Sequence, residues 1–279
     1  MPVQAAGFPA VSAEPAARRP LGTVLSRLRD GTVAMAWAEL RKLRHDHVDI
    51  LTRSVQPLLW LFIFGTALRR NHQLSGGYPD YQAYLAPGVM AQAALFIAIF
   101  FGLAVIWERD VGQLQRLLAT PIPRLAIVLG KAGGAGIRAL TQASVLLIVM
   151  AITSISIDWR PVQIIGALVL LVLGTAGFAC LSMVLASLVR TRERFMGIGQ
   201  LILMPLFFAS SALYPLSIMP TWLRIVARVN PLTYEVHGMR QLMLGISVGG
   251  TLWVDFAVGI GFFAAMAFAA ARAYPRAIL

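Results

Sequence analysis

The chain has 279 residues, of which 58% are hydrophobic and 13% are charged, and its mean hydropathy is +0.73. Soluble domains have about half apolar and about a quarter charged residues, so this composition excludes an ordinary soluble protein and indicates an integral membrane protein. The formal net charge of +12 does not indicate a nucleic-acid partner, because Lys and Arg cluster beside apolar stretches, where anionic lipid headgroups attract them.

The first predicted helix covers residues 21–45 and follows a cytoplasmic tail, residues 1–20, that we expect to be disordered. The tail has its arginines after a weakly apolar stretch broken by prolines, which is the reverse of the order in a secretory signal peptide. Beyond the tail, Leu21, Leu25 and Leu28 recur at helical spacing opposite a basic face. This pattern predicts an amphipathic helix that lies in the membrane surface.

Six apolar stretches have about the 20 residues that a membrane-spanning helix needs. They cover residues 48–68, 83–107, 125–155, 162–189, 195–213 and 252–271. The first contains Pro57, which is tolerated where a neighbouring helix satisfies the backbone group that it frees. The third begins with a glycine-rich half, which allows close helix packing and in which we expect Lys131 and Arg138 to snorkel to the cytoplasmic interface. The predicted fold is an all-α membrane protein with one permease domain, residues 21–279.

The distribution of basic residues predicts the orientation of the chain. Six spans place both termini on the same side, and most of the 24 Lys and Arg residues then fall on that side. Because cytoplasmic loops carry an excess of Lys and Arg, we expect both termini to be cytoplasmic.

A charged segment, WERDVGQLQRLLATPIPR, separates the second and third spans at residues 107–124. On a helix, Val111, Leu114 and Leu118 share one face, with Leu117 beside them. The opposite face carries Arg109, Gln113, Arg116 and Thr120. Two interpretations stay open: a handle by which a soluble partner moves both spans, or a solvated interfacial helix without a partner.

Residues 213–245 form neither a clean span nor a polar loop, because prolines interrupt a mixture of aliphatic, aromatic and charged residues. Irregular backbone at membrane depth is allowed only where protein or a water-filled cavity covers it. In NPLTY, Asn230 is a suitable helix cap and Pro231 a suitable first helical residue, and Tyr234 suits the headgroup level. We therefore expect short re-entrant helices on the outer side, with an ordinary interfacial loop as the alternative.

The sequence contains no nucleotide-binding motif that could supply energy and no evident catalytic centre. It has no GxxxxGK[ST] motif, so the chain cannot cradle nucleotide phosphates itself. HDHVD, residues 45–49, begins a span, which favours a charged helix end over a metal site, and Cys180 has no evident base. None of the 12 acidic residues falls in the middle of a predicted span, which disfavours a proton-coupled secondary transporter and leaves a separate ATPase as the better source of energy.

Two long stretches resemble a known family. ERDVGQLQRLLATP resembles the ERE-x-GT-x-E-x-LLATP signature between the second and third spans of bacterial type-2 ABC exporter permeases, which include daunorubicin-resistance permeases. FFASSALYPLSIMPTWLRIVARVNPLTYEVHGMRQLMLG is similar to the same family's segment F-x-SG-x-x-FP-x-x-x-MP-x-W-L followed by NPLTY-x-x-x-x-x-R. The chain departs from these signatures at Gln113, Gln115 and Ser211, where the family usually has Thr, Glu and Gly.

The resemblance implies the membrane subunit of an ATP-driven ABC exporter in a bacterial plasma (inner) membrane, which moves a hydrophobic drug, lipid or lipid-linked cargo out of the cell. It implies a second permease copy, in a homodimer or heterodimer surrounded by lipid, and two cytoplasmic ATPase subunits. ATP and Mg would then bind to those subunits, and this chain would bind no cofactor. A proton-coupled secondary multidrug transporter is the alternative.

The resemblance also implies roles for particular residues. The coupling helix, residues 108–121, would dock on the ATPase through Glu108, Arg109, Asp110, Gly112, Leu114, Arg116 and Pro121. The re-entrant exit segment would include Tyr214, Pro215, Pro220, Asn230, Pro231 and Tyr234. Four aromatic residues of the spans are our candidates for the translocation path: Phe96, Phe100, Phe207 and Phe208.

Overall fold

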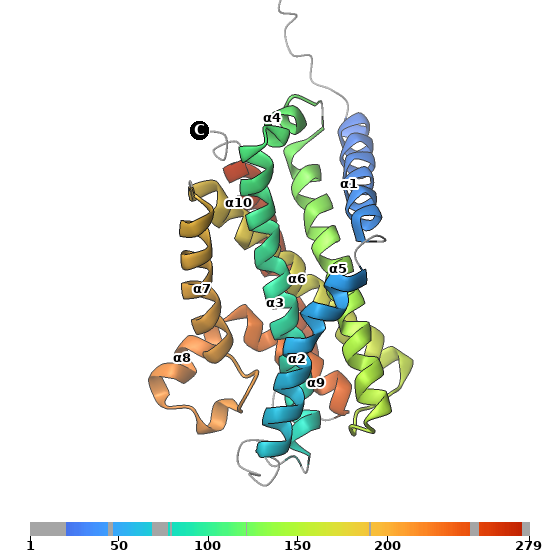
Figure 1. Cartoon of the computed structure of the whole chain (residues 1–279), viewed down its shortest axis with the longest axis vertical. Coiled ribbons are helices and arrows are strands. Elements are labelled where there is room, and N and C mark those ends of the chain that lie inside the picture. Colours follow the sequence, from blue (N-terminus) through green and yellow to red (C-terminus); the bar gives the residue numbers. More distant parts are fainter. Residues whose placement is uncertain are drawn as a thin grey trace, which may run out of the picture.

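The computed structural model describes residues 21–43, 47–68, 78, 80–120, 122–189, 191–245 and 251–274. Within these ranges the chain is all-helical, as predicted, with ten α-helices and one short 3-10 helix (Figure 1). The helices are α1 (Leu21–Leu43), α2 (His47–Ala67), α3 (Tyr81–Asp110), α4 (Gln113–Leu118), α5 (Arg124–Ile152), α6 (Pro161–Leu188), α7 (Arg192–Phe208), α8 (Thr221–Val229), α9 (Pro231–Leu244) and α10 (Leu252–Ala273), with the 3-10 helix at Leu216–Ile218. The predicted tail, residues 44–46 and Pro121 lie outside the described residues.

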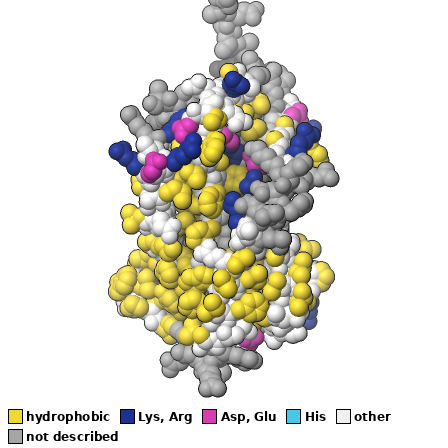
Figure 2. Space-filling view, viewed as in Figure 1, with side chains coloured by type: hydrophobic (Ala, Val, Ile, Leu, Met, Phe, Trp, Pro, Cys, Tyr) yellow, Lys and Arg dark blue, Asp and Glu magenta, His cyan; other side chains and the backbone are white. Residues whose placement is uncertain are grey.

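The long helices stand side by side in a bundle (Figure 1). α4 and the end of α10 lie at one end of this bundle, and α8 and α9 lie toward the other. Figure 2 shows a broad band of hydrophobic side chains across the half of the bundle away from α4, whereas most of the visible charged side chains lie toward α4. This distribution is typical of a membrane protein, in which an apolar zone lies in the lipid and charged side chains gather at the cytoplasmic end.

α3 and α6 meet at the centre of the bundle through a very close approach. The backbone N–H of Gly102 donates to Ser182 Oγ at 3.1 Å, and that hydroxyl donates to the carbonyl of Ile99 at 2.9 Å. A Cβ on Gly102 would come within 2.5 Å of the Ser182 backbone oxygen. Glycine at this position therefore allows the two helices to touch.

Among the described residues, four helices are long and apolar enough to cross a membrane: α3, α5, α6 and α10. They correspond to the second, third, fourth and sixth predicted spans. α7 has only 17 residues because the chain turns after Phe208, and α2 carries Asp49 and Arg53 in its first half. The complete six-span topology therefore stays a prediction at α2 and α7.

Pro57 interrupts the hydrogen-bond ladder of α2, because proline has no N–H to donate to the carbonyl of Arg53, four residues earlier. Gln142 of α5 donates its side-chain Nε2 to that carbonyl at 3.1 Å. The expectation that a neighbouring helix satisfies the freed group is confirmed, and the bond also ties α2 to α5.

α1 runs lengthwise along the first half of α5 (Figure 1). A Cβ on Gly130 would lie 2.3 Å from Cβ of Met35, and a Cβ on Gly134 would lie 2.7 Å from Cβ of Glu39. The glycines of α5 therefore serve close helix packing, as predicted. The same glycines allow α1 to lie along α5, and the position of α1 in the membrane surface stays a prediction.

Candidate functional site

The segment between α3 and α5 contains a helix break at Gly112. α3 continues to Asp110, and α4 begins at Gln113, so the predicted helix over residues 108–121 is divided in two. Gly112 has a φ of +71°, in the left-handed region. A residue with a side chain costs roughly 1–2 kcal/mol there, which explains why glycine occupies the break.

Glu108, near the end of α3, forms an ion pair within the protein. Its carboxylate oxygens lie 2.5 and 2.7 Å from Nζ of Lys131 on α5, and Lys131 is only 2% exposed. The expectation that Lys131 snorkels to the interface is therefore wrong, because the partly buried carboxylate of Glu108 satisfies its ammonium group inside the protein. Arg138 also faces a carboxylate, because its Nη2 lies 3.6 Å from Oε2 of Glu39 on α1.

The next two residues bind two further helices. Arg109 donates from Nη1 to the carbonyl of Val189, at the end of α6, at 3.2 Å. Asp110 accepts a 3.0 Å hydrogen bond from Arg192 of α7, whose guanidinium lies 4.3 Å from the centroid of the Trp107 ring. The three consecutive charged residues thus hold the end of α3 to α5, α6 and α7. We call these three contacts the clasp.

α4 has a buried and an exposed side. Leu114 is fully buried and Leu117 packs partly against the same core cluster, whereas Val111 is 57% exposed. Leu114 therefore seats α4 on the bundle and is not available to a partner. The Leu118 side chain and Pro121 lie outside the described part. The exposed polar residues are Gln113, Gln115, Arg116 and Thr120.

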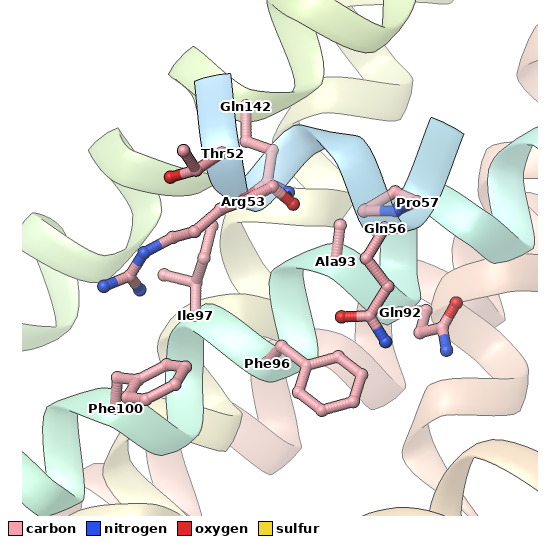
Figure 3. Close-up of a pocket in the computed structure, with 10 residues that line it drawn as sticks. All are labelled: Thr52, Arg53, Gln56, Pro57, Gln92, Ala93, Phe96, Ile97, Phe100 and Gln142. Carbon is pink, nitrogen blue, oxygen red and sulfur yellow. The ribbon is translucent and has the colours of Figure 1, made fainter. Parts of the chain in front are cut away.

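A cavity of about 420 Å³ lies between α2 and α3, with α5 on a third side (Figure 3). Its wall combines the rings of Phe96 and Phe100 with the side chains of Arg53, Gln56 and Gln92. The Arg53 guanidinium lies 4.7 Å from the centroid of the Phe100 ring. This volume and mixture of apolar and polar groups are typical of a site for a small organic molecule.

The structure brings together two of the four predicted path residues. Phe96 and Phe100 line the cavity, whereas Phe207 of α7 packs edge-on against Trp60 and Phe208 is 41% exposed. Gln92 was not predicted to line the path, although it is the one amide in the otherwise apolar stretch from residue 85 to 106. A single polar residue in an apolar span was the sequence signal that could have indicated a lining residue of the cavity.

The predicted helix start at NPLTY is confirmed. The side chain of Asn230 accepts a hydrogen bond from the Leu232 N–H at 3.0 Å, and Pro231 is the first residue of α9. Asn230 also donates to the carbonyls of Leu206 and Ala209, at 2.6 and 3.1 Å. One side chain therefore begins α9 and satisfies the end of α7.

The other predicted exit residues mark neighbouring helix ends. The Tyr214 hydroxyl donates to the carbonyl of Phe208 at 2.6 Å, and the Tyr234 hydroxyl donates to that of Arg228 at 2.8 Å. Two prolines stand directly before the next helices: Pro215 before the 3-10 helix and Pro220 before α8.

An acidic residue reaches the interior of the bundle. Glu235 of α9 is 5% exposed, and a Cβ on Gly174, midway along α6, would lie within 2.7 Å of both its carboxylate oxygens. Neither oxygen has a hydrogen-bond partner among the described residues. Glu235 lies outside the predicted spans, but α9 packs back against α6 and places this acid level with the middle of that helix, which the sequence did not predict.

Comparison with known proteins gives a consistent result. Residues 31–244 match the family model described as ABC-2 type transporter. The transport permease ycf38 of Pyropia yezoensis is 30% identical over 74% of this chain and 73% of its own length. Nodulation protein J of Rhizobium leguminosarum bv. trifolii is 29% identical, covering 71% of this chain and 74% of its own. The daunorubicin resistance ABC transporter permease protein DrrB1 of Streptomyces coeruleorubidus is 21% identical, covering 77% and 75%.

Proposed function

Because the chain belongs to the ABC-2 type transporter family, as an exporter permease without a nucleotide-binding domain of its own, we propose that a separate ATPase drives it through the exposed side of α4. Two cytoplasmic ATPase subunits, which hold ATP and Mg, act on two permease chains, identical or different. Both termini lie in the cytosol of a bacterial cell, and the short helices α8 and α9 line the exit on the outer side.

The clasp is the observation that carries this proposal. A force on α4 passes through Gly112 to the end of α3, where Glu108, Arg109 and Asp110 bind three other helices. Packed elements held at several points move as rigid bodies, so closure of the ATPase pair tilts α3, α5, α6 and α7 together. This movement opens a path between the two permease chains.

The cargo that we propose is a hydrophobic drug, lipid or lipid-linked molecule. The relatives support this range, since one is named for daunorubicin resistance and another for nodulation. The cavity beside Phe96 and Phe100 is a suitable entry to the path, because its wall is mainly apolar and lies within the bundle.

Charge reversal on α4 tests the docking surface. We expect Arg116→Glu to weaken co-purification of the ATPase by about tenfold or more and to stop efflux, since a like charge replaces an attractive one at the interface. Thermal unfolding of the permease itself should not change, because Arg116 is exposed. Arg160→Glu is the matched control, since Arg160 is exposed in the segment between α5 and α6. Equal binding by the Arg116 variant and the wild type would show that the ATPase docks elsewhere.

For the proton-coupled alternative, the candidate group is Glu235, whose buried carboxylate oxygens have no hydrogen-bond partner among the described residues. A buried carboxyl without a partner is stable only in its neutral form, so Glu235→Gln preserves both its shape and its charge state. We expect this variant to fold with an unchanged midpoint of thermal unfolding and to keep ATP-driven efflux. Loss of efflux with normal folding and normal ATPase binding would instead indicate that Glu235 carries a proton during transport.

A further inference from the structure

Gln92 is a buried amide in an otherwise apolar part of α3. It is the one polar residue between positions 85 and 106, and it is only 5% exposed. Its Oε1 has no hydrogen-bond partner in the part of the chain that the structure describes. Burying an amide oxygen without a hydrogen bond costs free energy, so the described contacts do not explain why a glutamine stands at this position.

The same amide borders the cavity of about 420 Å³ between α2 and α3. Figure 3 shows Gln92 and Arg53 on opposite sides of the view, with Phe96 between them. The Arg53 guanidinium lies against the Phe100 ring, 4.7 Å from its centroid, so the charged part of the wall is away from Gln92. Gln92 therefore presents a polar group to the cavity in an apolar part of the wall.

The two other amides of the wall do not supply the missing hydrogen bond. Gln142 of α5 donates its Nε2 to the carbonyl of Arg53 at 3.1 Å, and Gln56 of α2 is exposed. A single water is a poor substitute, because a buried water needs two to four polar partners and the apolar wall beside Gln92 supplies no others. The missing partner is therefore a polar group that an apolar molecule carries into the cavity.

A hydroxyl group matches an amide well, because each of them both donates and accepts hydrogen bonds. We propose that the cavity binds an apolar molecule with a hydroxyl group, which donates to Gln92 Oε1 while Phe96, Ile97 and Phe100 contact the apolar body. Gln92 then determines specificity for an alcohol over the corresponding ether. The assignment rests on the proposed export function only in treating the bound molecule as cargo, because the binding itself needs no ATPase.

A direct test compares two fluorescent probes with the same ring system, 1-pyrenemethanol and its methyl ether. Both have the apolar body, but only the alcohol can donate a hydrogen bond. Each probe is mixed with increasing amounts of the full chain in phosphatidylcholine nanodiscs, and binding is the rise in fluorescence anisotropy over empty nanodiscs. After correction for partition into the empty nanodiscs, we expect the wild type to prefer the alcohol by about tenfold, since the ether leaves a buried acceptor unpaired.

Gln92→Met removes the acceptor and keeps an unbranched side chain of similar size. We expect the preference for the alcohol to disappear, because alcohol binding weakens about tenfold while ether binding stays. Binding of the ether also shows that the cavity is intact. The midpoint of thermal unfolding should not fall, because the replaced oxygen has no partner among the described residues.

Gln56→Met is the matched control, since Gln56 is an exposed amide on the wall of the same cavity. It should keep the preference of the wild type for the alcohol. The inference is wrong if neither probe binds, if the wild type binds the two probes equally, or if Gln92→Met keeps the preference. A lower unfolding midpoint for Gln92→Met with an unchanged preference would assign Gln92 a structural role instead.

Reconstitution with the ATPase separates this inference from the proposed function. ATP-dependent export of the alcohol, faster than that of the ether in the wild type but not in Gln92→Met, identifies a cargo site. A preference for the alcohol in binding without ATP-dependent movement supports the ligand class and contradicts a place for the cavity on the path. If other molecules are exported while no preference is found, this inference fails alone. If the ATPase does not bind, the proposed function fails alone.

Discussion

Arg240→Met should abolish accumulation of the folded permease. Arg240 is 2% exposed, and its guanidinium lies 3.7 Å from the centroid of the Tyr84 ring on α3. It donates to the carbonyls of Tyr84 at 3.2 Å, Ser211 at 2.9 Å and Ala212 at 3.4 Å. The substitution leaves buried carbonyls unsatisfied, at about 1–3 kcal/mol each, in a protein with roughly 5–15 kcal/mol of total stability.

The measurement is the yield of monodisperse protein after detergent extraction, together with the midpoint of thermal unfolding. Arg240→Lys should fail almost as completely, because an ammonium group cannot reach separate carbonyls in the forked geometry of a guanidinium. Arg228→Met is the matched control, since Arg228 lies on α8 with an exposed side chain. Normal yield from both Arg240 variants would show that α9 is held by other contacts.

Arg240 illustrates which parts of the fold the sequence pattern predicted. Helical periodicity and the cap residues Asn230 and Pro231 are local signals, so the start of α9 was predictable. The partners of Arg240 lie 28 to 156 residues away in the chain, and no local pattern encodes such contacts. The return of α9 into the bundle, which also carries Glu235 to the middle of α6, was missed for the same reason.

In the predicted coupling helix, residues 108–121, the sequence also predicted some features and missed others. The periodicity of its leucines correctly placed Leu114 and Arg116 on different faces, but Leu114 was expected to dock on the ATPase and is instead fully buried against the bundle. The pattern could not show that Gly112 divides the helix, because a left-handed residue needs a specific backbone path on both sides. Nor could it show that Glu108 turns inward to Lys131, since charged residues on an interfacial helix ordinarily face water.

The cavity was the least predictable feature. Phe96 and Phe100 were selected as aromatic residues at helical spacing, and the same reasoning selected Phe207 and Phe208, which do not line the cavity. Spacing on one helix cannot determine which face meets an open space, because the position of α2 against α3 determines it. Arg53 lies on α2, and only the packing of the two helices places it beside Phe100.

Charge reversal at either residue of the Glu108–Lys131 ion pair should strongly lower the stability of the permease. Lys131→Glu places two carboxylates in a site where the lysine is 2% exposed, so we expect a loss of about 3–5 kcal/mol and little folded protein. Glu108→Lys should be similarly damaging, because two ammonium groups then share the site. The double variant Glu108→Lys with Lys131→Glu restores opposite charges, and we expect it to recover much of the yield and thermal stability.

A milder variant tests the same pair as part of the clasp. Lys131→Met removes the ammonium group while preserving apolar bulk, and chain that folds should still bind the ATPase, because the exposed side of α4 is unchanged. If the clasp transmits force, that complex hydrolyses ATP at near the normal rate but exports less cargo per ATP, since α3 is no longer held to α5. The exposed pair of Arg29 and Asp30 is the control, and Arg29→Gln should change neither quantity. Full export by Lys131→Met would contradict a mechanical role for the pair and leave it a role in folding alone.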